Sequence, residues 1–183
     1  MYDILFSLWF FLPAGIANAA PIIASRLPVL KNWSWPIDGG RRYRGIRIFG
    51  PHKTWRGLLV GAMAGGLVFV LQAALSDNLG SFTNYLDDKE FTMLPLWFGA
   101  VLGFGALAGD AIESFFKRQR HIKSGEPWLV LDQVDYIIGA CLLSLLFIQF
   151  DWHIYALILL NWFVLHIIFS YLGYRLHLKN SPI

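Results

Sequence analysis

Four acidic residues lie close to apolar segments in the stretch GDAIESFFKRQRHIKSGEPWLVLDQVDY, residues 109–136. Asp110 and Glu113 are three positions apart within one apolar run, and Asp132 and Asp135 have the same spacing at the start of the next. On a helix, residues three positions apart share a face, so each pair is directed to one side. An ionised carboxylate inside a membrane span costs about 2.5–3.5 kcal/mol, so these acids need partners or a wet cavity.

Asp110, Asp132 and Asp135 are the predicted metal ligands. The segment 116–131 connects their two helices, so the three carboxylates can converge at one boundary of the membrane. Hard oxygen ligands without a His or Cys cluster suit Mg²⁺ rather than Zn²⁺, and an incompletely coordinated Mg²⁺ usually binds substrate phosphates as well. Nearby cations could neutralise the same phosphates. These are Lys117, Arg118, Arg120 and Lys123. The combination indicates phosphoryl or nucleotidyl transfer to a lipid.

A structural interpretation of the same acids stays open. Glu113 and Lys117 are spaced for an ion pair within one helix, and Ser114 lies on nearly the same face as Asp110 and Lys117. At the start of the next run, Asp132 suits a helix cap and the following acid suits the first turn. Capping does not account for Asp110, which lies deep in the neighbouring run.

A second basic element, GPHKTWRG at residues 50–57, precedes another apolar run. Its glycines and proline indicate a tight backbone path, while Lys53, Thr54 and Arg56 supply donors near a helix start, where anions are favoured. The spacing differs from that of a P-loop. The alternative is a cluster of positive charge that only orients the chain in the membrane.

The whole chain has the composition of a membrane protein. Its 183 residues are 56% hydrophobic and 16% aromatic, which exceeds the usual share in a water-soluble domain. A spanning helix needs about 20 residues, so the length allows about five spans in one membrane-embedded domain, residues 1–183. We predict an all-α integral membrane protein with transmembrane helices near residues 4–24, 57–76, 93–115, 132–149 and 152–172.

The first and fourth runs have alternative interpretations. Ala17, Asn18 and Ala19 loosely resemble a signal-peptide cleavage site, but the first residues of the chain lack the positive charge of such peptides, which favours a retained helix. The fourth run begins with two acids. Only a polar break around Asp151 separates it from the fifth run, so these two spans should form a tight helical hairpin.

Basic residues are distributed unevenly between the runs. Of the 15 Lys and Arg residues, the segment 26–56 holds eight, the segment 117–123 holds four and the tail holds Arg175 and Lys179, whereas Lys89 alone lies between the second and third runs. The positive-inside rule then predicts a multi-pass cell-membrane protein with the N-terminus outside and the C-terminus cytoplasmic. The loops 25–56 and 116–131 and the site beside them would face the cytoplasm.

This orientation, together with anionic lipid headgroups, accounts for the net charge of +3. The arginines of the first cytoplasmic loop form either an orientation signal or a lipid-binding patch: Arg41, Arg42, Arg44 and Arg47. The chain contains no basic-aromatic nucleic-acid module, so no nucleic-acid partner is expected. Cys141 is a single cysteine in an apolar run and offers no disulfide framework. The oligomeric state is not indicated.

At these motifs the sequence resembles the CDP-archaeol synthase family of integral-membrane, CTP-dependent cytidylyltransferases. Asn18 and Pro21 match an early Asn-x-x-Pro pattern, and residues 50–57 match a Gly-x-x-Lys-Thr-Trp-x-Gly segment. The stretches GDAIESFFKR and LDQVD match the acidic core of the family. The more distant CDP-diacylglycerol synthases share this core, but their His-Gly-Gly before the acidic pair is absent here.

The resemblance implies condensation of CTP with an unsaturated archaeal ether-lipid phosphate, giving a CDP-lipid and pyrophosphate. It implies that Asp110, Asp132 and Asp135 hold or act through Mg²⁺, with Lys117 also catalytic. The nucleotide phosphates would be held by Lys53, Thr54, Arg56, Gly57 and Arg118, and the cavity would also include Asn18, Glu113 and Ser114. Phosphatidate is the alternative acceptor. An ion or proton transporter and a noncatalytic scaffold are the rival classes, although a cation pathway has little use for lysines and arginines at its mouth.

Overall fold

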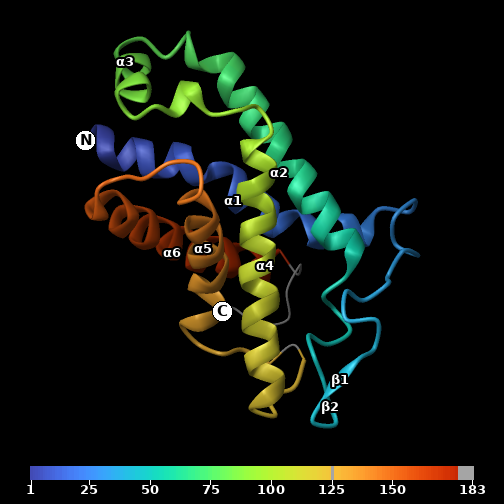
Figure 1. Ribbon diagram of the computed structural model, residues 1–183. Coiled ribbons are helices and arrows are strands. Elements are labelled where there is room, and N and C mark those ends of the chain that lie inside the picture. Colours follow the sequence, from blue (N-terminus) through green and yellow to red (C-terminus); the bar gives the residue numbers. More distant parts are fainter. Residues whose placement is uncertain (125, 177–183) are drawn as a thin grey trace.

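The computed structural model describes residues 1–124 and 126–176, and helices dominate it (Figure 1). The long helices are α1 (Tyr2–Arg26), α2 (Trp55–Ser76), α4 (Phe98–Gln119) and α6 (Trp152–Arg175). The shorter ones are α3 (Ser81–Asp88), the 3-10 turn η1 (Phe91–Met93) and α5 (Leu131–Ser144). Two very short strands, β1 (Arg42–Tyr43) and β2 (Ile46–Arg47), form an antiparallel hairpin in the long loop before α2. The predicted all-α class is confirmed.

Four helices of the described part are long and apolar enough to cross a membrane, namely α1, α2, α4 and α6. They correspond to the predicted first, second, third and fifth spans, although α4 begins five residues later than predicted, at Phe98. The fourth predicted span, 132–149, contains α5, which has 14 residues and ends at Ser144. A full crossing takes about 20 residues, so α5 alone is short for one. The count of five spans therefore stays a prediction.

The apolar run after α5 is not helical, and its last part packs against the core. Turns follow Ser144, and Phe150 then packs edge-on against Phe6 and Phe10 of α1, with ring centroids 5.2 and 4.9 Å apart. Aromatic pairs of this geometry contribute beyond the area that they bury. The predicted tight hairpin between the last two spans is thus a longer connection, residues 145–151, in which Ile148 is buried and Phe150 packs against the core, whereas Leu145, Leu146 and Phe147 are exposed.

Helix α1 lies at the centre of the bundle and packs against α2, α4 and α6, so the first apolar run is part of the folded protein. Pro13 interrupts α1 and has no N–H, which leaves the carbonyl of Trp9 without its helical donor. Gln72 of α2 supplies the missing bond, with its Nε2 donating to the Trp9 oxygen at 2.6 Å. A backbone group freed within the membrane is in this way satisfied by the neighbouring helix.

Helices α2 and α4 run side by side (Figure 1) and approach through glycine. A Cβ placed on Gly65 would lie 2.5 Å from the carbonyl oxygen of Gly99, closer than real contacts allow. Small residues at helix interfaces permit such backbone packing in membranes, where burial of apolar surface does not drive association.

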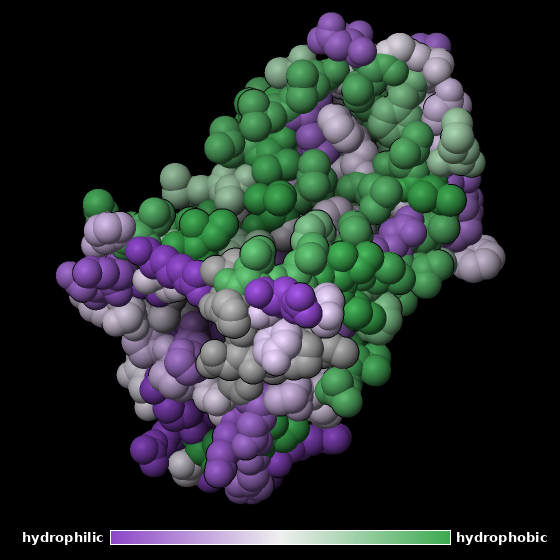
Figure 2. All heavy atoms as spheres, turned by 180° about the vertical axis from the view of Figure 1, so that it is seen from behind, coloured by the Kyte–Doolittle hydropathy of each residue, from purple (hydrophilic) through white to green (hydrophobic). Residues whose placement is uncertain are grey.

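The two ends of the molecule differ in polarity. Figure 2 shows hydrophobic residues over most of the upper part of one face, with hydrophilic residues at its top rim and gathered at its lower end. That lower end carries the β1–β2 hairpin and the C-terminal end of α4 in Figure 1. The polar loops that precede α2 and follow α4 thus lie at the same end of the bundle, as the charge distribution predicted. Lys179, which contributed to that prediction, lies outside the described residues.

Candidate active site

The basic element at residues 50–57 and the acidic segment at residues 109–136 meet in one polar pocket of about 780 Å³. Its walls come from the α1, α2, α4, α5 and α6 helices and from the loop before α2. The predicted site residues that line it are Asn18, Lys53, Thr54, Arg56, Gly57, Asp110, Asp132 and Asp135. The other lining residues are Pro21, Ile22, Ser25, Arg26, Ile37, His52, Leu58, Leu107, Ala111 and His166. The structure therefore brings together the basic loop, the three predicted metal ligands and the early Asn-x-x-Pro pattern.

An ion pair joins the two motifs directly. The Nζ of Lys53 lies 2.6 Å from Oδ2 of Asp110, and each side chain is about a quarter exposed, at 24% and 28%. The two residues are 57 positions apart in the chain. The basic loop is thus fastened to α4 at the carboxylate that the sequence placed deepest in an apolar run.

Lys117 holds the second carboxylate. Its Nζ lies 3.0 Å from both oxygens of Asp132, and Oδ2 of Asp132 also accepts the N–H of Trp128 at 3.0 Å. The same ammonium lies 3.7 Å from Oε1 of Glu113, one turn earlier on α4. Lys117 and Glu113 are buried and lie outside the pocket lining. In this arrangement Lys117 orients Asp132 and offsets its charge.

The third carboxylate is positioned by close packing of α4 on α5. Oδ1 of Asp135 accepts the backbone N–H of Tyr136 at 2.6 Å. Gly109 of α4 lies against this turn, and a Cβ there would meet the Asp135 carbonyl carbon and the Gly139 Cα, each at 3.0 Å. A side chain at Gly109 would therefore push α5 away and move Asp135 relative to its neighbour Asp110.

The N-terminus of α2 faces the pocket and is locally well formed. Oγ1 of Thr54 accepts the N–H of Gly57 at 3.2 Å, which caps the helix. The guanidinium of Arg56 donates to the carbonyls of Leu30 and Lys31 at 3.0 and 3.1 Å. Arg56, predicted to bind nucleotide, thus ties down the chain after α1 while it also lines the pocket.

The remaining predicted site residues lie behind the pocket wall. Ser114 and Arg118 are buried on α4 and do not line the pocket. The guanidinium of Arg118 lies near Gly50, since a Cβ on that glycine would be 3.7 Å from its Nη1. Arg118 is therefore next to the basic loop but outside the lining of the cavity.

Comparison with known proteins identifies the family. A family model described as CarS-like, CDP-archaeol synthase, matches residues 1–183. The chain belongs to the CDP-archaeol synthase family. A curated CDP-archaeol synthase from Thermofilum pendens is 36% identical over 180 residues, covering 96% of this chain and 79% of that protein. The corresponding protein of Methanocaldococcus jannaschii is 32% identical over 181 residues, covering 98% of this chain and 97% of its own.

A solved structure agrees with this assignment. It is described as an intramembrane enzyme for archaeal membrane lipids biosynthesis, and it superposes on this chain with a TM-score of 0.73 at 31% identity. The match covers 91% of this chain and 94% of the other. CDP-archaeol synthases are enzymes, which decides against the transporter and scaffold alternatives. The predicted resemblance to this family is confirmed.

Among the lining residues that were not predicted for the site of this CDP-archaeol synthase fold, three have basic or titratable side chains, namely His166, Arg26 and His52. His166 of α6 faces the pocket and lies against the ring of Tyr136, with centroids 5.6 Å apart. Arg26 and His52 line the same cavity. A single His in an apolar run carries no spacing signal that would mark it as a site residue. Only the approach of α6 to α1 and α5 places it at the site.

The three carboxylates of the pocket are the type of ligand that Mg²⁺ prefers. Asp110, Asp132 and Asp135 supply hard oxygen donors to one cavity, and two of them are already paired with ammonium groups, which shows that the site accommodates positive charge. Within residues 1–124 and 126–176, no three His, Cys, Asp or Glu side chains are grouped closely enough to ligate one ion. The predicted magnesium site therefore stays a prediction.

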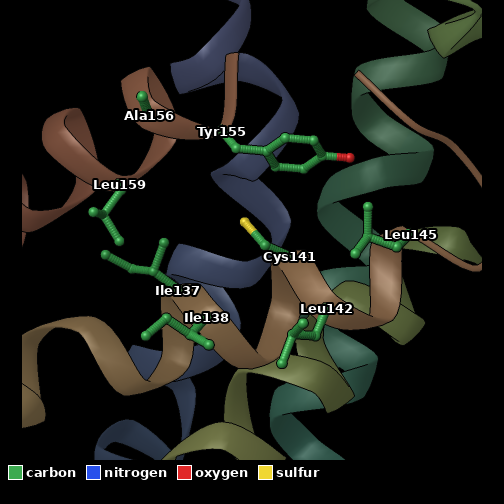
Figure 3. Close-up of a pocket in the computed structure, with 8 residues that line it drawn as sticks. All are labelled: Ile137, Ile138, Cys141, Leu142, Leu145, Tyr155, Ala156 and Leu159. Carbon is green, nitrogen blue, oxygen red and sulfur yellow. The ribbon is translucent and has the colours of Figure 1, made fainter. Parts of the chain in front are cut away.

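A second pocket, of about 370 Å³, lies between α5 and α6 (Figure 3). It is lined by Ile137, Ile138, Cys141, Leu142, Leu145, Tyr155, Ala156 and Leu159. Figure 3 shows these side chains around a space between the two helices. The lining is almost wholly apolar, so this pocket can hold hydrocarbon but has no charged group for catalysis.

Proposed function

We propose that this protein transfers the cytidylyl group of CTP to an archaeal ether-lipid phosphate, and that the polar pocket is its active site. Family membership supports the reaction. The observation that supports the location is the convergence of Lys53 and Thr54 with Asp110, Asp132 and Asp135 around one cavity. A cavity of about 780 Å³ is within the size range of ligand pockets in proteins.

The reaction needs charge stabilisation more than proton transfer. An oxygen of the lipid phosphate attacks the α-phosphorus of CTP, a new P–O bond forms, and the bond to the bridging oxygen breaks as pyrophosphate leaves. The nucleophile is already anionic, so the barrier is mainly repulsion between two polyanions and the charge that builds on the leaving group. Positioned cations lower both contributions, and no covalent enzyme intermediate is required.

Lys53 and the start of α2 would hold the nucleotide phosphates. An ammonium has three donors, so Lys53 can contact a phosphate while it keeps, or exchanges, its bond to Asp110. The helix dipole at the N-terminus of α2 favours an anion beside Thr54. The two groups are adjacent in sequence and line the same wall, so they would act on one triphosphate.

Asp110, Asp132 and Asp135 are the residues that would hold Mg²⁺ together with the substrate phosphates, since the three carboxylates alone are not grouped closely enough to ligate one ion. When bound, this ion would neutralise charge on the phosphates and on the leaving pyrophosphate. The role of Lys117 in that arrangement is to keep Asp132 ionised and oriented, through its bonds of 3.0 Å to both carboxylate oxygens.

The acceptor would reach the pocket from the membrane along α5 and α6. On α5, Asp135 lines the polar pocket and Cys141 lines the apolar one, about 9 Å further along at 1.5 Å per residue. On α6, His166 lines the polar pocket and Leu159 lines the apolar one. A lipid whose phosphate lies among the acids could therefore extend one hydrocarbon chain into the α5–α6 pocket. With the polar end of the bundle on the cytoplasmic side, CTP would enter from the cytoplasm.

Pyrophosphate release by the purified protein in detergent tests the proposal. The reaction would contain CTP, Mg²⁺ and either archaeal ether-lipid phosphate or diacyl phosphatidate, with each component omitted in turn. We expect release that requires CTP, metal and the ether lipid, and none from Asp110→Asn, which removes charge at nearly constant shape. A preference for phosphatidate would change the acceptor class. No release with either lipid, despite a folded protein, would refute the proposed function.

A further inference from the structure

The loop before α2 is folded around one buried carboxylate, that of Asp38. Its Oδ1 accepts hydrogen bonds from the N–H of Gly40 at 2.9 Å and from the guanidinium of Arg47 at 2.6 Å. Its Oδ2 accepts the N–H groups of Phe49 and Gly50, both at 3.1 Å. Four donors thus converge on one side chain. Such a carboxylate connects both ends of the β1–β2 hairpin and defines how the loop is folded.

This loop is joined to the pocket by a short ladder. Pro36 and Thr54 form an antiparallel bridge, and the N–H of Ile37 donates to the carbonyl of Lys53 at 2.9 Å. Ile37 is also a lining residue of the pocket, directly before Asp38 in the chain. The segment that carries Lys53 and Thr54 is therefore held from one side by the residues directly before Asp38. Asp38 itself does not line the pocket.

We propose that Asp38 is a positioning residue for CTP, which acts through Ile37 and the Lys53–Thr54 segment without touching the substrate. The inference rests on the proposed function, because it concerns nucleotide binding in the same pocket. Lys53 also contacts Asp110 of α4, so its Nζ is located by two anchors, the ladder on the loop side and the ion pair on the helix side. Loss of the hydrogen bonds to Asp38 would loosen the contact on the loop side and leave the ion pair with Asp110 in place.

The hydrogen bonds to Asp38 need a charged carboxylate. An amide in its place has one acceptor oxygen, and its NH₂ group would face N–H donors that are then left unpaired. Burial acts to raise the pKa of Asp38, but the hydrogen bonds from Arg47, Gly40, Phe49 and Gly50 outweigh it and hold the pKa at about 2. Asp38 is therefore ionised under any ordinary assay condition, and Asp38→Asn is an informative change.

The test compares CTP binding and steady-state kinetics of the wild-type protein and Asp38→Asn. Titration calorimetry with CTP and Mg²⁺ measures binding without turnover. We expect a rise of about tenfold in Kd and in KM for CTP, since one charged hydrogen bond is of this size. The KM for the lipid and kcat at saturating CTP should stay near wild-type values. Partial unfolding would instead reduce kcat per total protein and leave both KM values unchanged.

Asp88→Asn is the matched control, because Asp88 is an exposed acid on α3 at the other end of the molecule. Arg47→Lys is the milder variant should Asp38→Asn fail to fold, since it keeps the carboxylate and the three backbone hydrogen bonds. We expect it to raise the KM for CTP less, and to leave the lipid KM unchanged. Wild-type affinity for CTP in the folded variants would overturn the inference about Asp38 and leave the proposed function unaffected. No CTP binding by the wild-type protein would overturn the proposed function, and the inference with it.

Discussion

Replacement of Lys117 by Met should destabilise the protein and abolish activity together. The side chains of Lys117 and Glu113 are 9% and 8% exposed, and that of Asp132 is 26% exposed. Met is close in volume but leaves two carboxylates without their cation. Breaking a buried ion pair from one side costs about 3–5 kcal/mol. Because water reaches Asp132, we expect the lower end of that range, about 3 kcal/mol.

The double variant Lys117→Met/Glu113→Gln supplies the internal comparison. It removes the acid that faces Asp132 once the ammonium is gone, so it should recover part of the lost free energy of unfolding, and activity should stay low because Asp132 is still unanchored. Unfolding free energies in detergent and pyrophosphate release would be measured on the same preparations. Wild-type stability of Lys117→Met, with only a raised KM for CTP, would refute the reasoning. Lys117 would then be a nucleotide ligand, as its position beside the acids first indicated.

Three other predictions address packing, the lipid path and pH. Gly109→Ala should cost about 1–3 kcal/mol of unfolding free energy and lower turnover, whereas Gly66→Ala, whose Cβ would make an ordinary 3.4 Å contact, should not. Ala156→Trp should raise the KM for the lipid about tenfold and leave the KM for CTP unchanged, with the exposed Leu160→Trp as its control. The folded-state pKa of Asp38 is depressed to about 2, so its stabilising contribution is present above its ordinary pKa and is lost as pH falls from about 4 towards 2. Acid unfolding of Asp38→Asn should lack that part of the pH dependence, and an identical profile would contradict it.

The membrane class and the positions of four spans follow from the sequence because hydropathy is a local, additive property. Runs of about 20 apolar residues have few stable alternatives to a spanning helix. The same reasoning overestimated the fourth run. Residues 145–150 are as apolar as a helix in the bilayer, but Phe150 fills a space beside Phe6 and Phe10 that exists only once α1 is packed. Hydropathy shows that a segment prefers apolar surroundings, but it does not show whether those surroundings are lipid or the interior of the protein.

Several residues that meet in the polar pocket were also predictable from the sequence. Charge near a membrane run is costly, which marks Asp110, Asp132 and Asp135 in the sequence, and the structure places all three on one cavity with Lys53 and Thr54. The sequence alone thus determined which residue types are available for phosphate and metal chemistry, and at which end of the bundle they lie. These conclusions depend on composition and on spacing within single helices, which the chain carries locally.

Only the tertiary structure determined which charged side chains pair with one another. Lys53 pairs with Asp110 across 57 positions. Lys117 keeps a 3.7 Å contact with Glu113, which spacing within α4 predicted, but it lies closer, at 3.0 Å, to Asp132 on the next helix. Helical periodicity defines the face on which a residue lies, but the residue opposite that face depends on how α4, α5 and the loop before α2 approach one another. That approach is decided by backbone contacts such as Gly109 against α5, which no pattern of side-chain polarity encodes.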